Sequence, residues 1–140
     1  DHCASSAGRD EIDVKNYHIP AIVYGDKLIK PQEVSKLCSQ IDIFPSVFGQ
    51  LHWSYTSNFF GTNVLSNSYK ERALIGTYLK LACKTDNNVM ILSNQKNNSN
   101  YTWNSVSNHL KVVPMNKSKL NETIAWYQAA DYLYLNAKLK

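Results

Sequence analysis

Apolar and polar positions change their rhythm about halfway along the chain. In the first half, a short apolar run at residues 19–24 ends at a Gly-Asp pair and predicts a buried strand followed by a turn. Residues 31–41 open with a proline and then place apolar side chains at helical spacing, which predicts a helix. A second, shorter helix is expected over residues 42–51. A strand followed by helices is typical of α/β proteins.

The second half of the chain instead favours a small antiparallel sheet closed by a helix. Residues 85–88 form a turn-rich tetrad that suits a hairpin between two apolar runs. The expected strands lie at residues 74–81, 89–92, 101–103 and 110–113. Residues 119–139 predict a closing amphipathic helix, with Asn116 and Ser118 as alternative N-terminal caps.

The composition indicates that the chain can form a folded hydrophobic core. The chain has 140 residues, of which 44% are hydrophobic, with nine Tyr and three Trp, enough for one compact domain. It contains no apolar run of about 18 residues or more, so no segment is expected to span a bilayer. No signal peptide is visible, and the start at Asp1 without Met suggests a cut fragment with an upstream anchor left open.

The charge distribution argues against nucleic acid as a partner. The net charge is +4, but Lys and Arg are scattered and no basic run is interleaved with aromatic residues. Anionic partners or an anionic membrane surface are permitted by this balance without being indicated by it.

Few residues suggest chemistry by themselves. Asp1 and His2 pair a carboxylate with an imidazole, and both groups bind divalent cations, although a dipeptide at a chain end also arises by accident. His18 precedes the expected strand, where a hydrogen-bonded core or edge histidine is the ordinary interpretation. Ser5 and Ser6 lack the surroundings of a nucleophile elbow.

The three cysteines, Cys3, Cys38 and Cys83, have no CxxC spacing, which argues against a zinc site built on them. An odd count suits a reducing compartment as well as one disulfide plus a free thiol, and composition does not choose between the two. Cys83, just after the expected strand at residues 74–81, is interpreted as a small apolar core residue.

An ordered set of short motifs favours the interpretation of Asp1 and His2 as metal ligands. The chain reads DHCASSAG at its start, then YHIP, then SQIDIFPS, then FFG, and ends in an amphipathic helix. In this order the motifs resemble the late part of bacterial sulfatase-like proteins grouped with lipoteichoic acid synthase, within the alkaline phosphatase superfamily. The matching segments are residues 1–8, 17–20, 25–31, 37–46, 59–61 and 125–139.

This resemblance implies a metal-dependent enzyme acting on phospho- or sulfo-esters. Asp1 and His2 match the late metal-ligand pair of that family, whose catalytic ion is Mn, Mg, Zn or Ca. The nucleophile, a Thr or Ser activated by the ion, lies upstream, so the chain alone is expected to be inactive. Arg9 and His18 become candidate contacts to the anionic substrate, with a solvated loop arginine as the alternative for Arg9.

The resemblance also implies an architecture and a location. Residues 1–66 would be the tail of the catalytic α/β domain, and residues 67–140 a subdomain of antiparallel strands and a helix. Such enzymes are anchored in the bacterial cell membrane by upstream segments, with the catalytic domain outside the cytoplasm. In that compartment a Cys3–Cys38 disulfide becomes plausible.

Three functions therefore compete. The leading one is a share in a phosphoglycerol- or phosphoethanolamine-transferase-like or sulfatase-like enzyme of the cell envelope, with anionic lipids or polymers as substrates. The second is a non-catalytic binding or assembly module that recruits a glycan or a protein through the sheet and the aromatic-rich helix. The third is a structural fragment. Self-association over an open sheet edge is left open.

Overall fold

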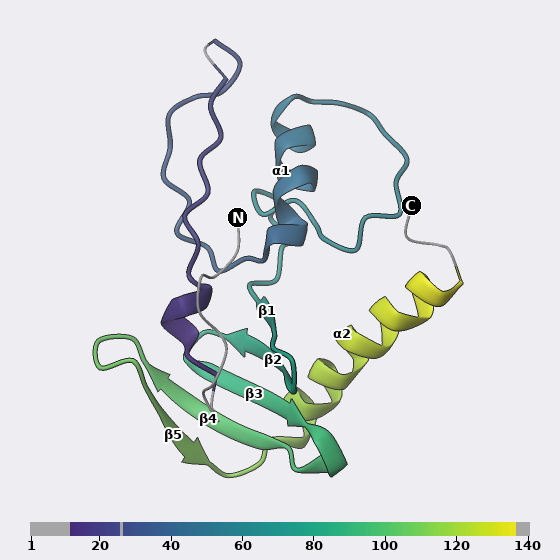
Figure 1. Ribbon diagram of the computed structural model, residues 1–140. Helices are drawn as coiled ribbons and strands as arrows, with labels where there is room; N and C mark the ends of the chain where they lie inside the picture. Colours follow the sequence, from purple (N-terminus) through teal and green to yellow (C-terminus); the bar gives the residue numbers. More distant parts are fainter. Residues whose placement is uncertain (1–11, 26, 137–140) are drawn as a thin grey trace. The chain divides into compact units, whose positions relative to one another are not determined.

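The computed structural model describes residues 12–25 and 27–136 (Figure 1). These residues form two compact units, each built from separate stretches of the chain. The first unit, called the sheet unit below, contains residues 12–21 and Leu74–Ala125. The second, called the loop unit, contains Ile22–Ala73 and residues 126–136. The predicted division at residues 66 and 67 concerns the roles of two segments in a longer enzyme and stays a prediction.

A five-stranded sheet with strand order β1-β2-β3-β4-β5 dominates the sheet unit (Figure 1). The strands are β1 (Ala73–Gly76), β2 (Lys80–Thr85), β3 (Asn88–Ser93), β4 (Ser99–Asn104) and β5 (His109–Val113). The pairs β2–β3, β3–β4 and β4–β5 are antiparallel. Consecutive strands are neighbours, so short turns suffice to connect them.

The β2–β3 hairpin has the two-residue turn that its sequence requires. Thr85 pairs with Asn88, which leaves Asp86 and Asn87 as the turn. Asp86 has a φ of 48°, and Asp and Asn tolerate this left-handed conformation better than most residues. The predicted hairpin is confirmed, as are the strands at 101–103 and 110–113.

The apolar core of this unit lies on the central strands. Val89 and Ile91 of β3 are almost completely buried, together with Ala82 of β2 and Tyr101 of β4. Ile12 and Val14 join the same cluster from the start of the described chain, and Val14 belongs to the 3-10 helix η1 (Val14–Tyr17). The N-terminal stretch therefore packs against the sheet across a long sequence separation.

The closing helix, α2, runs from Lys117 to Leu135. The Asn116 side chain accepts a hydrogen bond from the Lys119 backbone N–H at 3.1 Å, so Asn116, rather than Ser118, caps the helix. The predicted helix over 119–139 is confirmed for its described part. A further 3-10 turn, η3 (Asn94–Lys96), precedes β4.

The loop unit contains little regular structure. The 3-10 helix η2 (Gln40–Asp42) leads directly into α1 (Ile43–Gln50), and the predicted helix over 42–51 is confirmed. The remainder of Ile22–Ala73 follows irregular paths. Together with the sheet and closing helix, these elements confirm the predicted fold class, an α/β portion followed by a small antiparallel sheet with a closing helix.

The strand expected at residues 19–24 is wrong. These residues have no regular structure, and Ile22 and Tyr24 are 91% and 87% exposed. Pro20 offers no backbone N–H for a ladder. A strand forms only when a neighbouring strand pairs with it. The apolar pattern of residues 19–24 was therefore not sufficient to predict one.

The helix expected over residues 31–41 is also wrong. The stretch is irregular up to η2 because side chains take the backbone groups that a helix would use. The Leu37 N–H donates to the Glu71 carboxylate at 2.8 Å, and the Ser39 N–H donates to the Asp42 carboxylate at 3.0 Å. Helical spacing of apolar residues was present, but long-range polar contacts decided the backbone.

The strand expected at 74–81 is divided in two by a turn at Thr77. The Thr77 hydroxyl accepts hydrogen bonds from the backbone N–H groups of Leu79 and Lys80. This local side-chain bonding reverses the chain and separates β1 from β2.

Candidate functional site

The sequence-predicted site residues fall mostly outside the described part of the chain. Asp1, His2 and Arg9 lie among residues 1–11, so their predicted roles stay predictions. His18 is exposed at the end of η1, and its backbone N–H donates to the Lys15 carbonyl. Residues 12–25 and 27–136 contain no group of three or more His, Cys, Asp or Glu side chains that could hold a metal ion.

Two of the three cysteines, Cys38 and Cys83, lie in the described part of the chain. Cys38 is a half-buried free thiol, and Cys83 is buried in β2, as expected for a core position. Burial, reinforced by the Asp42 carboxylate, raises the pKa of Cys38. The other member of the implied Cys3–Cys38 disulfide lies outside the described residues, and Cys38 is not cross-linked here.

The most organised polar site of the described residues is centred on Asp42 in the loop unit. Asp42 is completely buried, and its carboxylate accepts hydrogen bonds from residues that precede and follow it in the sequence. One oxygen accepts from the Thr62 N–H at 2.9 Å and from Arg72 Nη2 at 3.0 Å. The other accepts from the Ser39 N–H at 3.0 Å, the Tyr69 hydroxyl at 3.1 Å and Arg72 Nη1 at 2.8 Å.

Arg72 completes this site as a bidentate partner of Asp42. Its side chain is 4% exposed, and two parallel N–H···O bonds match the guanidinium fork to the carboxylate. The guanidinium also lies over the Trp126 ring, 4.5 Å from the ring centroid, and 5.7 Å from that of Tyr69. Its Nε finds no hydrogen-bond acceptor among the described residues.

The pKa shifts reflect the pairing of the two buried charges of Asp42 and Arg72. Burial alone would raise the pKa of Asp42, but hydrogen bonds from Arg72, Ser39 and Thr62 outweigh burial and lower it. Burial alone would lower the pKa of Arg72, but the Asp42 carboxylate raises it. Burial and the same carboxylate raise the pKa of Tyr69 well above its usual range. Asp42 and Arg72 are therefore charged in the folded protein at neutral pH.

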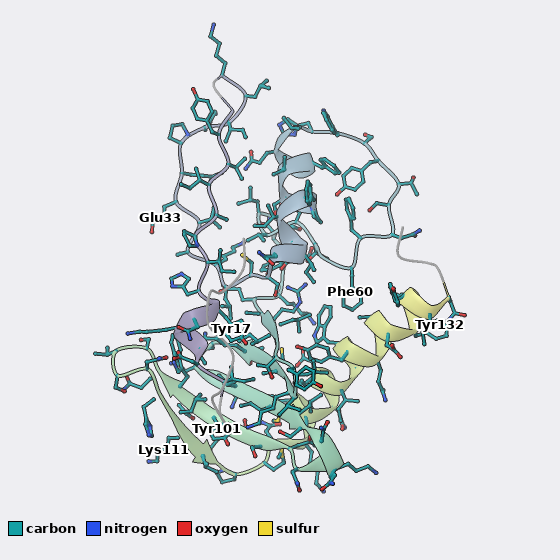
Figure 2. The ribbon with its side chains drawn as sticks, in the orientation of Figure 1. Tyr17, Glu33, Phe60, Tyr101, Lys111 and Tyr132 are labelled. Atoms are coloured by element: carbon teal, nitrogen blue, oxygen red, sulfur yellow. The ribbon has the colours of Figure 1, made fainter. Side chains whose placement is uncertain are left out.

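Gly61 of the FFG motif explains how the loop reaches Asp42. It is buried, and a Cβ at this position would lie 1.9 Å from the Ile41 carbonyl oxygen, which is backbone. Only glycine allows this close approach, which brings the neighbouring Thr62 N–H to the Asp42 carboxylate. Phe60, labelled in Figure 2, packs edge-to-face on Trp126, with ring centroids 5.3 Å apart.

A second set of polar contacts fixes the start of α1 to the same loop. The Ser46 hydroxyl donates to the Asp42 carbonyl at 2.6 Å and accepts from the Val64 N–H at 2.9 Å. The Lys36 ammonium donates to the Val64 carbonyl at 3.0 Å. The side chains of Ser46 and Lys36 thus hold the backbone of Val64, which lies in the loop after α1.

This arrangement braces the fold, and it offers no route for a reacting group. Both charged partners are buried and form a bidentate ion pair, so a substrate has no access to them. Sequence reasoning identified Asp42 as a helix start and as part of the SQIDIFPS motif, but it missed Arg72 and Tyr69. A usable signal was present, because residues 43–69 contain no Lys, Arg, Asp or Glu and are bounded by charges of opposite sign.

Neither unit contains a membrane span. Within the described residues, no helix combines the length and apolar character needed to cross a bilayer.

Comparison with known proteins shows a likeness in fold to a solved structure. No family model matches the chain. A solved structure of a protein in the alkaline phosphatase superfamily from Vibrio parahaemolyticus matches it with a TM-score of 0.86 and 23% sequence identity. The match covers 96% of this chain and 33% of that one, so the chain spans about a third of that protein's length. The described architecture therefore shares the fold of a part of that protein.

Proposed function

We propose that this chain is part of a metal-dependent enzyme of the alkaline phosphatase superfamily that transfers or hydrolyses phospho- or sulfo-esters. The observation that carries the proposal is the fold likeness to a protein of that superfamily over 96% of the chain. The ordered motifs that resemble sulfatase-like and lipoteichoic acid synthase-like proteins support the same class independently.

Asp1 and His2 are the residues of this chain that would hold the ion. The carboxylate oxygen of Asp1 suits Mn, Mg or Ca, and the imidazole nitrogen of His2 suits Zn. Two protein ligands leave an ion mostly coordinated by water, so further ligands would come from upstream residues. When bound, such an ion neutralises charge on phosphoryl oxygens and lowers the pKa of a nucleophile.

The finer assignments follow from the same resemblance. Arg9 and His18 are proposed contacts to an anionic phospho- or sulfo-ester, and His18 is exposed, as such a contact requires. The enzyme is proposed to act on envelope lipids or polymers outside the cytoplasm, anchored in the bacterial membrane by upstream segments.

The test uses the intact enzyme that contains this chain. Metal content after dialysis is measured by inductively coupled plasma mass spectrometry. Turnover is measured with bis(p-nitrophenyl) phosphate as the substrate. His2→Ala is expected to lower metal retention and to reduce turnover by on the order of a hundredfold, because an ion ligand is lost. His109→Ala is the matched control, since His109 is exposed on β5, and it should leave both unchanged.

A metal-free enzyme, or a His2→Ala variant equal to wild type, would contradict the proposal. Either result would favour the alternative function, a non-catalytic binding or assembly module. The isolated chain is expected to show no turnover with the same substrate.

A further inference from the structure

An exposed cluster of aromatic rings extends from α1 into the loop that follows it. Phe48 lies at its centre and contacts four other rings at centroid distances of 5.1 to 6.4 Å. We call these five side chains, listed here, the aromatic surface: Phe44, Phe48, Trp53, Tyr55 and Phe59. All of them belong to the loop unit.

The outer rings of this surface are open to solvent. Phe44 is 66% exposed, Trp53 60%, Tyr55 45% and Phe59 42%. The Trp53 indole stacks on the Phe48 ring at 5.4 Å with 29° between the planes, so Phe48 covers one of its faces. Because the Trp53 side chain is largely exposed, its indole remains accessible to a flat ligand.

The backbone holds Trp53 in this position. At the end of α1 the Trp53 N–H donates to the Phe48 carbonyl at 3.2 Å, and the His52 N–H donates to the Gly49 carbonyl at 3.2 Å. His52 has a φ of 53°, the left-handed conformation of a helix-ending Schellman motif. That motif brings together the two residues whose rings stack here. The indole is thus ordered before any ligand arrives, which reduces the entropy cost of binding.

The segment of the chain that carries the rings is polar but uncharged. Residues 43–69 contain no Lys, Arg, Asp or Glu. Between the aromatic residues lie exposed side chains with hydroxyl or amide groups, Ser54, Thr56, Ser57 and Asn58. These groups both donate and accept hydrogen bonds.

From these observations we infer that the aromatic surface binds a neutral carbohydrate. The negative face of an aromatic ring attracts the slightly positive C–H hydrogens on the flat side of a sugar. Neighbouring hydroxyl and amide groups match the many hydroxyls of such a ligand, and the absence of charge matches its neutrality. The inference rests on the loop unit alone and does not depend on a metal ion or on ester chemistry.

Two other occupants fit the observations less well. A protein surface that docks on an anionic membrane usually adds Lys or Arg to its aromatic residues, and residues 43–69 contain neither. A second copy of the chain would be expected to cover a more continuous apolar face than rings interrupted by four polar side chains. Both occupants are outcomes of the test below.

The test titrates the chain with maltohexaose, cellohexaose and chitohexaose by isothermal calorimetry, with tryptophan fluorescence as a second signal. At least one oligosaccharide is expected to bind, and Trp53→Ala should weaken that binding by about tenfold or more, since a stacking ring is lost. Tyr78→Ala is the matched control. Tyr78 is 99% exposed and belongs to the sheet unit. Its substitution removes an aromatic ring that is not part of the aromatic surface, so the affinity should change by less than about twofold.

His52→Gly separates a folding effect from a binding effect. Glycine is favoured at the left-handed position, so this variant should fold and retain binding, while Trp53→Ala should fold and lose it. Absence of binding to all three oligosaccharides would overturn the inference, as would an equal loss in the Tyr78→Ala variant. It would also fail if Trp53→Ala instead abolished sedimentation with vesicles of phosphatidylglycerol and phosphatidylcholine or dissociated a dimer in analytical ultracentrifugation.

Discussion

The sheet unit and the loop unit are held together in different ways. In the sheet unit, successive strands pair with their neighbours and bury an apolar cluster around Val89 and Ile91. In the loop unit, the most deeply buried side chain is the Asp42 carboxylate, and its partner is Arg72, thirty residues later. One unit depends on repeated local contacts and apolar burial, and the other on a single charged centre.

The difference determines where backbone hydrogen bonds go. Strands satisfy one another's N–H and C=O groups along a ladder. In the loop unit, carboxylates and hydroxyls replace the ladder, since Glu71, Asp42 and Ser46 all accept from backbone N–H groups elsewhere in the chain. A backbone satisfied by side chains is stable only while those side chains remain paired. The loop unit should therefore be far more sensitive to single polar substitutions than the sheet unit.

The largest expected effect is the loss of the Asp42 charge. Asp42→Asn leaves the buried Arg72 guanidinium without a counter-charge, and removal of one partner of a buried ion pair costs about 3–5 kcal/mol. Urea unfolding followed by tryptophan fluorescence measures the change. Asp86→Asn makes the same chemical change in an exposed turn of the sheet unit, where Asn also tolerates the positive φ. Equal effects of the two substitutions would contradict the comparison.

A smaller loss is expected from Gly61→Ala. The new methyl group would meet the Ile41 carbonyl at 1.9 Å, so backbone must shift at a cost of about 1–3 kcal/mol. Gly76→Ala in β1 is the control, because its Cβ would find its nearest neighbour, Leu81 Cδ2, at an ordinary 3.8 Å. Thermal unfolding should show a lower midpoint for the first variant and a nearly unchanged one for the second. A stable Gly61→Ala protein would mean that the close approach is unnecessary.

The smallest of the three effects is a dependence on acid. Because the pKa of Asp42 is lower in the folded protein than in the unfolded chain, the unfolded chain takes up a proton first as the pH falls. The contribution of Asp42 is fully present above its unfolded pKa of about 4 and is lost as the pH falls toward the folded value. Urea midpoints measured from about pH 6 to about pH 3 should fall less steeply in Asp42→Asn than in wild type. Parallel curves would contradict this assignment.

The sequence predicted the sheet unit better than the loop unit for the same physical reason. A two-residue turn, alternating strands and a helix with a cap at Asn116 are all determined by residues close to one another in the chain. The helix expected over 31–41 failed because its backbone bonds to Glu71 and Asp42, which no local pattern reveals. Thr77 divided a strand through hydrogen bonds that a survey of apolar positions does not include.

The candidate chemistry was only partly within reach of the sequence. The motif around Asp42 and the FFG motif were both noticed, but their connection through Thr62 and Gly61 depends on the folded chain. Arg72 and Tyr69 attracted no attention, because a charged residue beside Lys70 and Glu71 looks like an ordinary solvated stretch. The metal role of Asp1 and His2 came from the resemblance, and it stays a prediction.

Hydrogen exchange followed by mass spectrometry tests the contrast between the two units most directly. Wild type and Asp42→Asn are compared peptide by peptide under native conditions. Our account predicts faster exchange in peptides covering residues 37–72 of the variant and unchanged protection in peptides covering residues 80–113. Unchanged exchange in both regions, or an equal increase in both, would show that the Asp42–Arg72 pair does not hold the loop unit separately from the sheet.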